Sequence, residues 1–419
     1  MLGRYKNTIL ASLGVGFEYY DFIIYALMGV YLGDIFFQGD HSTNSFYYFS
    51  IFAIGYFFRP LGGVIFGLIS DKYGRKKSFS ILILAMAIAT FAIGILPTHK
   101  EFLHISVLIL IFARILQGVA LGGELPNALV LVHESNARNP VHSGILTSSA
   151  TAGNILALLV LFSLSTFLTK DEIIKWGWRI PFLFGGALAM GCYFLRQNII
   201  ETDEFLKIKN EVSKQMISYP LKLIISKDLY KILFAAFLSG CVGSFIAVFF
   251  YIPTYIGRYY HYEVKEVYYF MTAALIFSLV IAPLVGVVAG HITKRKIIII
   301  TSLSIILFVQ PVFALLGSGG EFNLIAFMFL YELVATILYV TNLALLADLF
   351  DVKVRSTAIS FCYNIGTALA SLSPVLITFL IKSGNDPSIL VSFFTTVGIL
   401  MPISLVALMR ITKGGTNDR

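Results

Sequence analysis

The feature that most constrains the fold of this chain is a series of long apolar stretches that recurs from one end to the other. About 20 apolar residues suffice for an α-helix to cross the hydrocarbon core of a bilayer. The 419 residues are 58% hydrophobic and only 13% charged, which is too little charge for the surface of a soluble protein of this length. The sequence therefore predicts an all-α polytopic membrane protein.

The apolar stretches divide into twelve predicted transmembrane helices. Strands are not expected, because the sequence lacks the isolated ten-residue segments of alternating hydrophobicity that are typical of membrane barrels. The three cysteines lie within these spans and are expected to be core residues rather than metal ligands. The predicted spans are 8–33, 46–69, 78–97, 103–131, 143–168, 178–196, 229–256, 267–290, 297–317, 322–347, 355–380 and 389–411.

The basic residues predict the orientation of the chain. With a cytoplasmic N-terminus, 22 of the 31 Lys and Arg residues lie on the inner side, seven lie outside, and Arg59 and Arg114 lie within spans. Lys and Arg accumulate on the cytoplasmic side of membrane proteins, so we expect a multi-pass protein of the bacterial inner membrane with both termini in the cytoplasm. The net charge of +8 follows from these loops, and no nucleic-acid partner is expected. The N-terminus has no small-residue cleavage site, so the first span is expected to be retained.

An internal repeat predicts that the protein is built from two related halves. GLISDKYGRKK (Gly67–Lys77) follows the second span, and GVVAGHITKRK (Gly286–Lys296) follows the eighth, although the second copy has Gly290 in place of Asp71. Such repeats are common in duplicated transporters.

The longest polar segment, 197–228, divides the spans six and six. We expect an N-terminal six-helix bundle over 1–196, a cytoplasmic linker over 197–228 and a C-terminal six-helix bundle over 229–419.

Several motifs carry a resemblance to a known family. The first copy of the repeat, Gly67-x-x-x-Asp71-Lys72-x-Gly74-Arg75-Lys76-Lys77, resembles the signature loop of the major facilitator superfamily and lies in the matching place between spans 2 and 3. The resemblance implies the major facilitator fold, with two pseudo-symmetric six-helix bundles that work by alternating access. Five further stretches resemble its metabolite:proton symporter family, which imports organic acids or osmolytes with protons: GFEYYDF (16–22), FRPLGGVIFG (58–67), RILQGVALGGE (114–124), WGWRIPF (176–182) and VKVRSTAIS (352–360).

Four charged residues are predicted to meet near the middle of the membrane. Glu18 and Asp21 lie about 15–20 Å from the cytoplasmic end of the first span. Arg59 and Arg114 lie about 17–20 Å into the second and fourth spans. Intramembrane charges pair with one another or face a wet cavity, and transporter sites lie at this depth.

We expect Asp21 and Arg114 to form the proton-coupling pair, in which the substrate recruits the arginine and the released acid exchanges a proton. Two alternatives stay open, namely Glu18 as the proton carrier and a static ion pair.

Other polar residues within or next to the spans are candidates for substrate contacts and gates. Arg59 either clamps a carboxylate of the substrate or pairs with Glu18, and Asn154 either binds substrate or joins two helices. The other candidate substrate contacts are Arg114, Tyr25, Gln117, Glu332, Tyr339, Tyr363 and Asn364. The candidate gating residues are Gly67, Asp71, Gly74, Arg75, Lys76, Glu124, Asp348 and Arg355, with Glu124 expected to contact the loop at Arg75 and Asp348 expected to pair with Arg355.

The resulting functional prediction is proton-coupled uptake of a small carboxylate metabolite, such as a di- or tricarboxylate. Osmolyte-sensing members of the resembled family carry a long C-terminal coiled coil, whereas this chain ends nine residues after Arg410, and this difference places carboxylates first. The alternatives are a zwitterionic osmolyte such as proline or betaine, an exchanger or exporter, and a receptor without transport. We expect a monomer driven by the proton motive force, with no cofactor, metal or enzyme activity, because the sequence has no phosphate-binding loop, metal-ligand cluster or nucleophile motif.

Overall fold

The computed structural model describes residues 2–37, 41–135, 139–213, 222, 228–249, 251–260, 262–384 and 388–414, and these residues form helices and connecting turns without any strand. The first helices are α1 (Leu2–Leu27), α2 (Gly29–Phe36), α3 (His41–Tyr73), α4 (Arg75–Gly94), a short 3-10 helix (Lys100–Phe102), α5 (Leu103–Ser135), α6 (Val141–Phe167), α7 (Lys170–Glu172), a π-helical turn (Ile173–Gly177), α8 (Arg179–Arg196) and α9 (Asp203–Ser213). The later helices are α11 (Leu229–Phe249), α12 (Ile252–Tyr259), α13 (Val264–His291), α14 (Lys294–Gly317), α15 (Glu321–Leu349), α16 (Arg355–Ser371), α17 (Ser373–Gly384) and α18 (Ile389–Gly414).

The helices confirm a multi-pass membrane protein, with one difference in how the spans are counted. Among the described residues, ten helices are long and apolar enough to cross a membrane, and the bent pair of Lys170–Gly177 and Arg179–Arg196 gives an eleventh. The predicted span 355–380 is divided at Leu372 into α16, with 17 residues, and α17, with 12. Pro374 explains the division, because it has no backbone N–H with which to continue the first helix.

The first predicted span also comprises two helices. The span predicted over 8–33 corresponds to α1, which ends at Leu27, and α2, which begins at Gly29. Met28 between them is buried and keeps helical hydrogen bonds to Ile24 and Leu32.

By their contacts the residues group into two compact units. Unit 1 consists of Met1–Ala137, Ser149–Pro220 and Val352–Ser360, and unit 2 consists of Arg138–Ser148, Leu221–Asp351 and Phe361–Arg419. The predicted bundles place the two short segments differently, and the predicted linker 197–228 lies partly outside the described residues. The predicted domain boundaries therefore stay a prediction.

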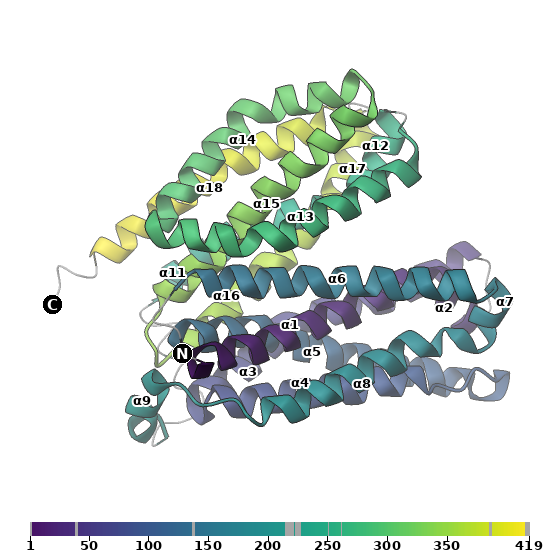
Figure 1. Cartoon of the computed structure of the whole chain (residues 1–419), viewed down its shortest axis with the longest axis horizontal. Helices are drawn as coiled ribbons and strands as arrows, with labels where there is room; N and C mark the ends of the chain where they lie inside the picture. Colours follow the sequence, from purple (N-terminus) through teal and green to yellow (C-terminus); the bar gives the residue numbers. More distant parts are fainter. Residues whose placement is uncertain are drawn as a thin grey trace. The chain divides into compact units, whose positions relative to one another are not determined.

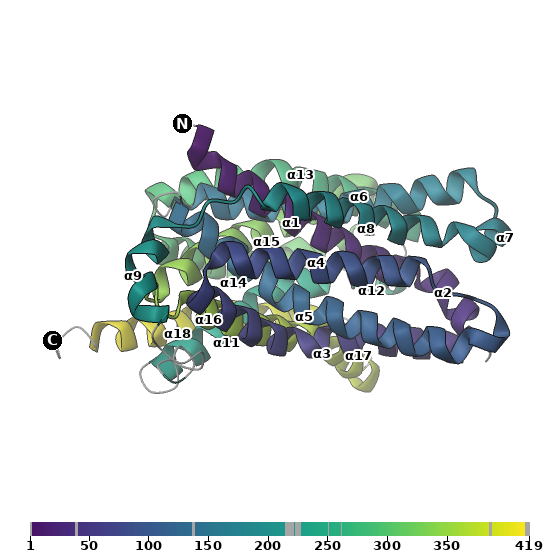
Figure 2. The same ribbon diagram turned by 90° about the horizontal axis from the view of Figure 1, so that it is seen from below.

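The helices of the two units have the same neighbours. In unit 1, α5 packs against α1, α3 and α4, and α8 packs against α1 and α4. In unit 2, α15 packs against α11, α13 and α14, and α18 packs against α11 and α14. The two patterns correspond helix for helix, which is the pseudo-symmetry expected from the repeated loop. Figures 1 and 2 show α1, α3, α4, α5 and α8 side by side along unit 1, with α9 at one end and α2 and α7 at the other.

Glycines allow α3 and α5 to approach each other closely. A Cβ atom added at Gly118 would lie 2.1 Å from the carbonyl oxygen of Gly55, and one added at Gly122 would lie 2.0 Å from that of Arg59. Membrane helices commonly associate through small residues of this kind. The close approach places Arg114 of α5 directly beside Gly55 of α3.

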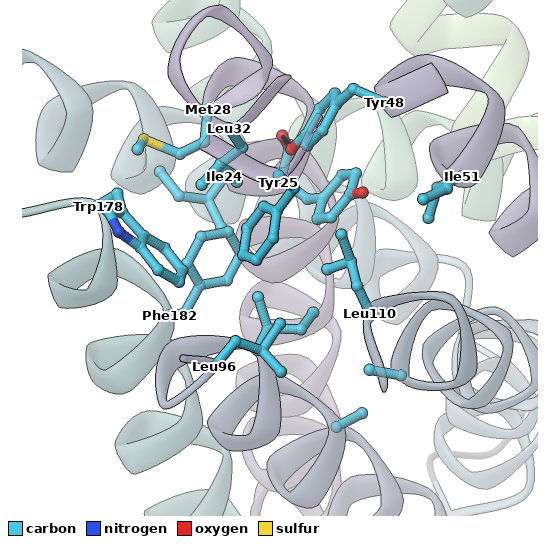
Figure 3. Packing of buried hydrophobic residues seen from close by; sticks show 14 of the residues in the cluster. Ile24, Tyr25, Met28, Leu32, Tyr48, Ile51, Leu96, Leu110, Trp178 and Phe182 are labelled. Atoms are coloured by element: carbon cyan, nitrogen blue, oxygen red, sulfur yellow. Dashed lines mark hydrogen bonds between the residues drawn. The ribbon is translucent and has the colours of Figure 1, made fainter. Parts of the chain in front are cut away.

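A cluster of buried aromatic side chains packs together in unit 1 (Figure 3). Tyr25 and Tyr48 stack with ring centroids 4.6 Å apart, and the Tyr48 hydroxyl donates to the Tyr25 carbonyl oxygen. Trp178 and Phe182 pack edge to face at 6.3 Å, and Phe182 also meets Tyr25. This packing joins α1, α3 and the start of α8, and it fixes the part of α1 that follows the two acids.

The α3–α5 contact gives a direct test of the packing. We expect Gly118→Ala to lower the thermal unfolding midpoint of the purified protein, because overpacking costs about 1–3 kcal/mol. Gly191→Ala is the matched control, since a Cβ there meets nothing within 4 Å, and it should leave the midpoint unchanged or raise it slightly. Equal midpoints for the two variants would contradict the close approach.

Candidate functional site

Asp21 lies in a buried network of neutral hydrogen-bond donors. The Thr90 hydroxyl of α4 donates to Asp21 Oδ1 at 2.8 Å, and Gln117 Nε2 of α5 donates to Oδ2 at 2.6 Å. Gln117 Nε2 also lies 3.0 Å from the Thr90 hydroxyl oxygen. The carboxyl group is thus held by two uncharged side chains from two different helices.

Arg114 reaches this network through Gln117. Its Nη1 donates to Gln117 Oε1 at 2.8 Å, so the amide group bridges the arginine to Asp21. The prediction of a direct Asp21–Arg114 ion pair was wrong, since the ion pairs of the described residues do not include it. Gln117 can occupy this place because it lies one helical turn after Arg114 on the same face of α5 and offers both a donor and an acceptor.

A cavity of about 10 Å³ adjoins the bridge, and a space of this size holds about one water molecule. Its polar lining comes from Asp21, Gln117 and Arg114, and its remaining lining residues are Phe22, Gly55, Met86, Gly118 and Leu121. Three polar side chains thus border one water-sized space.

Aromatic rings compensate the charge of Arg114. Its guanidinium carbon lies 4.0 Å from the ring centroid of Tyr25, 5.3 Å from that of Phe52 and 5.7 Å from that of Phe22. Its buried Nε has no hydrogen-bond partner. A guanidinium has five N–H donors, so this side chain retains hydrogen-bonding capacity for an incoming anionic group.

Glu18 has different surroundings from Asp21. Both of its carboxyl oxygens are buried without a hydrogen-bond partner, and no ion pair of the described residues joins it to Arg59. The Arg59 guanidinium carbon instead lies 5.6 Å from the Tyr56 ring centroid. Asn154 of α6 likewise has a buried side-chain oxygen without a partner. The roles of these residues stay predictions.

Glu124 forms a buried ion pair with Arg196, so the expected contact with the loop at Arg75 was wrong. Arg196 Nη1 donates to Glu124 Oε2 at 3.0 Å, and Nη2 donates to Oε1. Both side chains are buried, and the Arg196 guanidinium lies over the Phe79 ring. Arg196 is the last residue of α8, and the pairing could not be predicted because a basic residue at the end of a span resembles an ordinary loop charge.

The acid of the signature loop caps a helix. Asp71 Oδ1 accepts from the backbone N–H of Ser356 at 3.1 Å, and Oδ2 accepts from the backbone N–H and the hydroxyl of Thr357 at 2.8 and 2.7 Å. These are orphan N–H groups of the first turn of α16, which carries positive partial charge. Gly67, one turn before Asp71, lets α3 approach this turn, since a Cβ there would lie 2.7 Å from Thr357 Cα.

Next to this cap lies a buried network of ions. Arg75 Nε and Nη2 donate to Glu134 at 3.1 and 2.8 Å, and Nη1 donates more weakly to Asp71 at 3.4 Å. Glu134 also accepts from Arg355 at 2.8 Å, and Arg355 donates to Glu204 at 2.7 Å. Glu134 and Glu204 were missed from the sequence, because neither belongs to a motif.

A residue after α8 caps the start of α4. Gly74 has φ of +103°, a conformation that favours glycine, and it offers no side chain to cap the helix. The backbone N–H groups of Arg75 and Lys76 donate instead to Glu201 at 3.1 and 3.3 Å. Glu201 therefore connects the signature loop to the segment that follows α8.

The candidates of unit 2 form a separate group. The hydroxyls of Tyr339 and Tyr363 lie 2.8 Å apart, and Asn364 and Glu332 are buried. Asp348 pairs with Lys294 of α14. Asp348 and Arg355 belong to different units, so their expected pair stays a prediction.

Comparisons with known proteins agree with this architecture. The sequence profile of the Major Facilitator Superfamily matches residues 11–374. The proline/betaine transporter of Salmonella typhimurium is 27% identical over 426 aligned residues, which cover 96% of this chain and 84% of that protein. The glycine betaine/proline/ectoine/pipecolic acid transporter OusA of Dickeya dadantii is 27% identical over 418 residues, with 95% and 82% covered.

Solved structures show the same fold. The proton:xylose symporter XylE matches with a TM-score of 0.76 at 15% identity, over 97% of this chain and 95% of that one. The human organic anion transporter MFSD10 matches with a TM-score of 0.66 at 14% identity, over 97% and 99%. The twelve-helix fold predicted from the sequence is thereby confirmed.

The Glu124–Arg196 pair predicts an asymmetry between single and double variants. Glu124→Ala leaves a buried guanidinium uncompensated, which costs about 3–5 kcal/mol, whereas Glu124→Leu with Arg196→Met removes both charges and should unfold much closer to the native midpoint. Thermal unfolding of the purified protein measures both, with Glu204→Ala as a control at a partly exposed ion pair. Single and double variants that unfold at the same temperature would contradict the assignment.

Proposed function

The chain belongs to the major facilitator superfamily of membrane transporters, and on this premise we propose that it takes up a small zwitterionic osmolyte, such as proline or glycine betaine, together with protons. The relatives that match nearly the whole chain are named for proline and betaine, and this supports the zwitterion over the di- or tricarboxylate that the sequence favoured. The shortness of the segment after Arg410 is weaker evidence about the substrate than sequence identity to these relatives over nearly the whole chain. The proposal includes a bacterial inner membrane and cytoplasmic termini.

One observation carries the proton coupling, namely the bridge from Asp21 through Gln117 to Arg114. In this arrangement two neutral donors and a nearby guanidinium compensate the carboxylate. A substrate carboxylate competes for Arg114, because a guanidinium binds an ionised carboxylate, often through two parallel hydrogen bonds, more strongly than it binds a neutral amide. Once the guanidinium has turned away, Asp21 is left with less positive charge nearby, and binding a proton restores its neutrality.

This sequence of events makes the substrate and the proton bind together. The cavity beside Asp21 and Gln117 gives the proton a polar place from which to reach the carboxyl group. Release of the substrate returns Arg114 to Gln117, and Asp21 gives up its proton on that side of the membrane. In this mechanism, the coupling between substrate and proton depends on the neutral amide of Gln117, which lies between Asp21 and Arg114.

The second part of the proposal concerns the gate. Asp71 on the first turn of α16, and Arg75 with Glu134 and Arg355, form a set of contacts that a rearrangement of the helices would have to break. Alternating access by rocking of two bundles requires such contacts, which hold one state until the substrate has bound. We place this latch at the cytoplasmic side, because the loops around it are basic.

Asp21→Asn tests the coupling. In proteoliposomes with an acidic exterior, the native protein should accumulate radiolabelled proline. In the variant this gradient-driven accumulation should be about 5- to 150-fold lower, which is the usual range of coupling between two sites. Exchange of labelled for unlabelled proline should persist, because asparagine resembles the protonated acid. Glu101→Gln, an equal change of charge at an exposed residue, is the matched control. Uptake that ignores the gradient in both proteins would refute proton symport.

Competition tests the substrate class. Unlabelled glycine betaine should inhibit uptake of labelled proline, whereas succinate and citrate should not inhibit at the same concentration, because each brings an additional uncompensated negative charge to a buried site. Inhibition by the dicarboxylate and not by the betaine would return the assignment to organic acids.

A further inference from the structure

Three aromatic rings on α1 and α3 lie around the guanidinium of Arg114. A fourth ring, on α3, packs against two of them. We infer that Phe22, Tyr25, Phe52 and Tyr56, named here the aromatic box, form a binding site for a quaternary ammonium group, and that Arg114 occupies this site while no substrate is bound. The inference rests on the proposed function and specifies how the cationic end of the substrate is recognised.

The spacing of the rings along each helix brings them together. Phe22 and Tyr25 are three residues apart on α1, and Phe52 and Tyr56 are four apart on α3, so each helix presents two rings on one face. The Phe22 ring lies 5.0 Å from that of Phe52 and 4.8 Å from that of Tyr56, and the last two are 5.5 Å apart. Tyr25 lies parallel to Phe52 at 6.0 Å. The four rings form one continuous cluster.

The box already holds a cation. The Arg114 guanidinium carbon lies within 6 Å of three of the ring centroids and only 4.0 Å from Tyr25, which is the range of a cation–π interaction. Among the described residues, the side chain to which Arg114 donates a hydrogen bond is the neutral Gln117. The Arg114 Nε has no hydrogen-bond partner. The ring faces therefore provide much of the compensation for this buried charge.

A quaternary ammonium group fits the chemistry of the rings. It has no N–H, so only ring faces and close packing can recognise it. Phe22, Phe52 and Tyr56 are partly exposed, so packing does not use up their whole surface.

A zwitterion can exchange places with Arg114. Its carboxylate draws the guanidinium away from Tyr25, and its trimethylammonium group then covers the ring faces that the arginine has left. The number of positive charges over the rings stays the same throughout. A molecule that has only a carboxylate would leave the rings without a cation, and a molecule that has only an ammonium group would compete with Arg114 instead of moving it.

The test compares glycine betaine with 3,3-dimethylbutanoate, in which a carbon atom replaces the charged nitrogen. Both are used as inhibitors of labelled proline uptake by the reconstituted full chain. In the native protein the betaine should inhibit at the lower concentration. Tyr25→Leu and Phe52→Leu should raise the half-inhibitory concentration of betaine about 5- to 30-fold and leave that of its carbon analogue nearly unchanged.

Two control variants accompany these changes. Tyr25→Phe keeps the ring, so its half-inhibitory concentration for betaine should stay well below that of Tyr25→Leu. Phe57→Leu removes a ring of α3 that is 82% exposed and lies outside the box, and it should also have no effect. If a leucine variant does not fold, fluorinated phenylalanines at position 52 weaken the ring face in steps at nearly constant size, and the affinity for betaine should fall in the same steps.

The outcomes separate the box from the proposed function. Absence of proline uptake by the native protein would overturn the proposed function itself. Normal proline uptake, combined with equal inhibition by betaine and its carbon analogue or with an unchanged betaine affinity across the leucine or fluorinated series, would leave the transporter intact and overturn the box.

Discussion

A charge in the hydrocarbon interior of a membrane has to be compensated, and this requirement explains how the helices of unit 1 are connected. Four of the buried charges have compensating partners of different kinds. Two neutral donors hold Asp21, ring faces hold Arg114, a guanidinium holds Glu124, and the first turn of α16 holds Asp71. Because these partners lie on other helices, satisfying the charges fixes which helices must be neighbours.

These compensating contacts differ in how easily they can be broken and replaced by contacts with a substrate. Glu124 and Arg196 form two charge-assisted hydrogen bonds in a buried pair, and breaking such a pair is strongly destabilising. The bridge of Asp21, Gln117 and Arg114 is built from single hydrogen bonds through a neutral amide, each with one charged partner and worth about 1.5–3 kcal/mol net. We infer that the first pair is a fixed connection within unit 1 and that the bridge is the part that a substrate rearranges.

The sequence predicts the features that depend on local pattern. Apolar length located the helices, the repeated loop indicated the pseudo-symmetry, and the acids of GFEYYDF pointed to buried charge. It did not reveal the partners, because Arg75 and Glu134 are 59 positions apart and Arg355 and Glu134 are 221 apart. Gln117 was a candidate contact, but its place between two charges depends on how α1 and α5 pack.

The balance of charges gives a physical reason for a zwitterion that is independent of any relative. Unit 1 brings two acids of α1, Glu18 and Asp21, near two arginines, Arg59 and Arg114, so the buried set is close to neutral when all four are ionised. A dicarboxylate adds two negative charges to this set and needs two protons to restore neutrality. A zwitterion adds none, so in the proposed mechanism the single proton taken up by Asp21 is the only change in net charge that accompanies the substrate. A site with one exchangeable bridge is therefore better matched to a neutral dipolar molecule than to a polyanion.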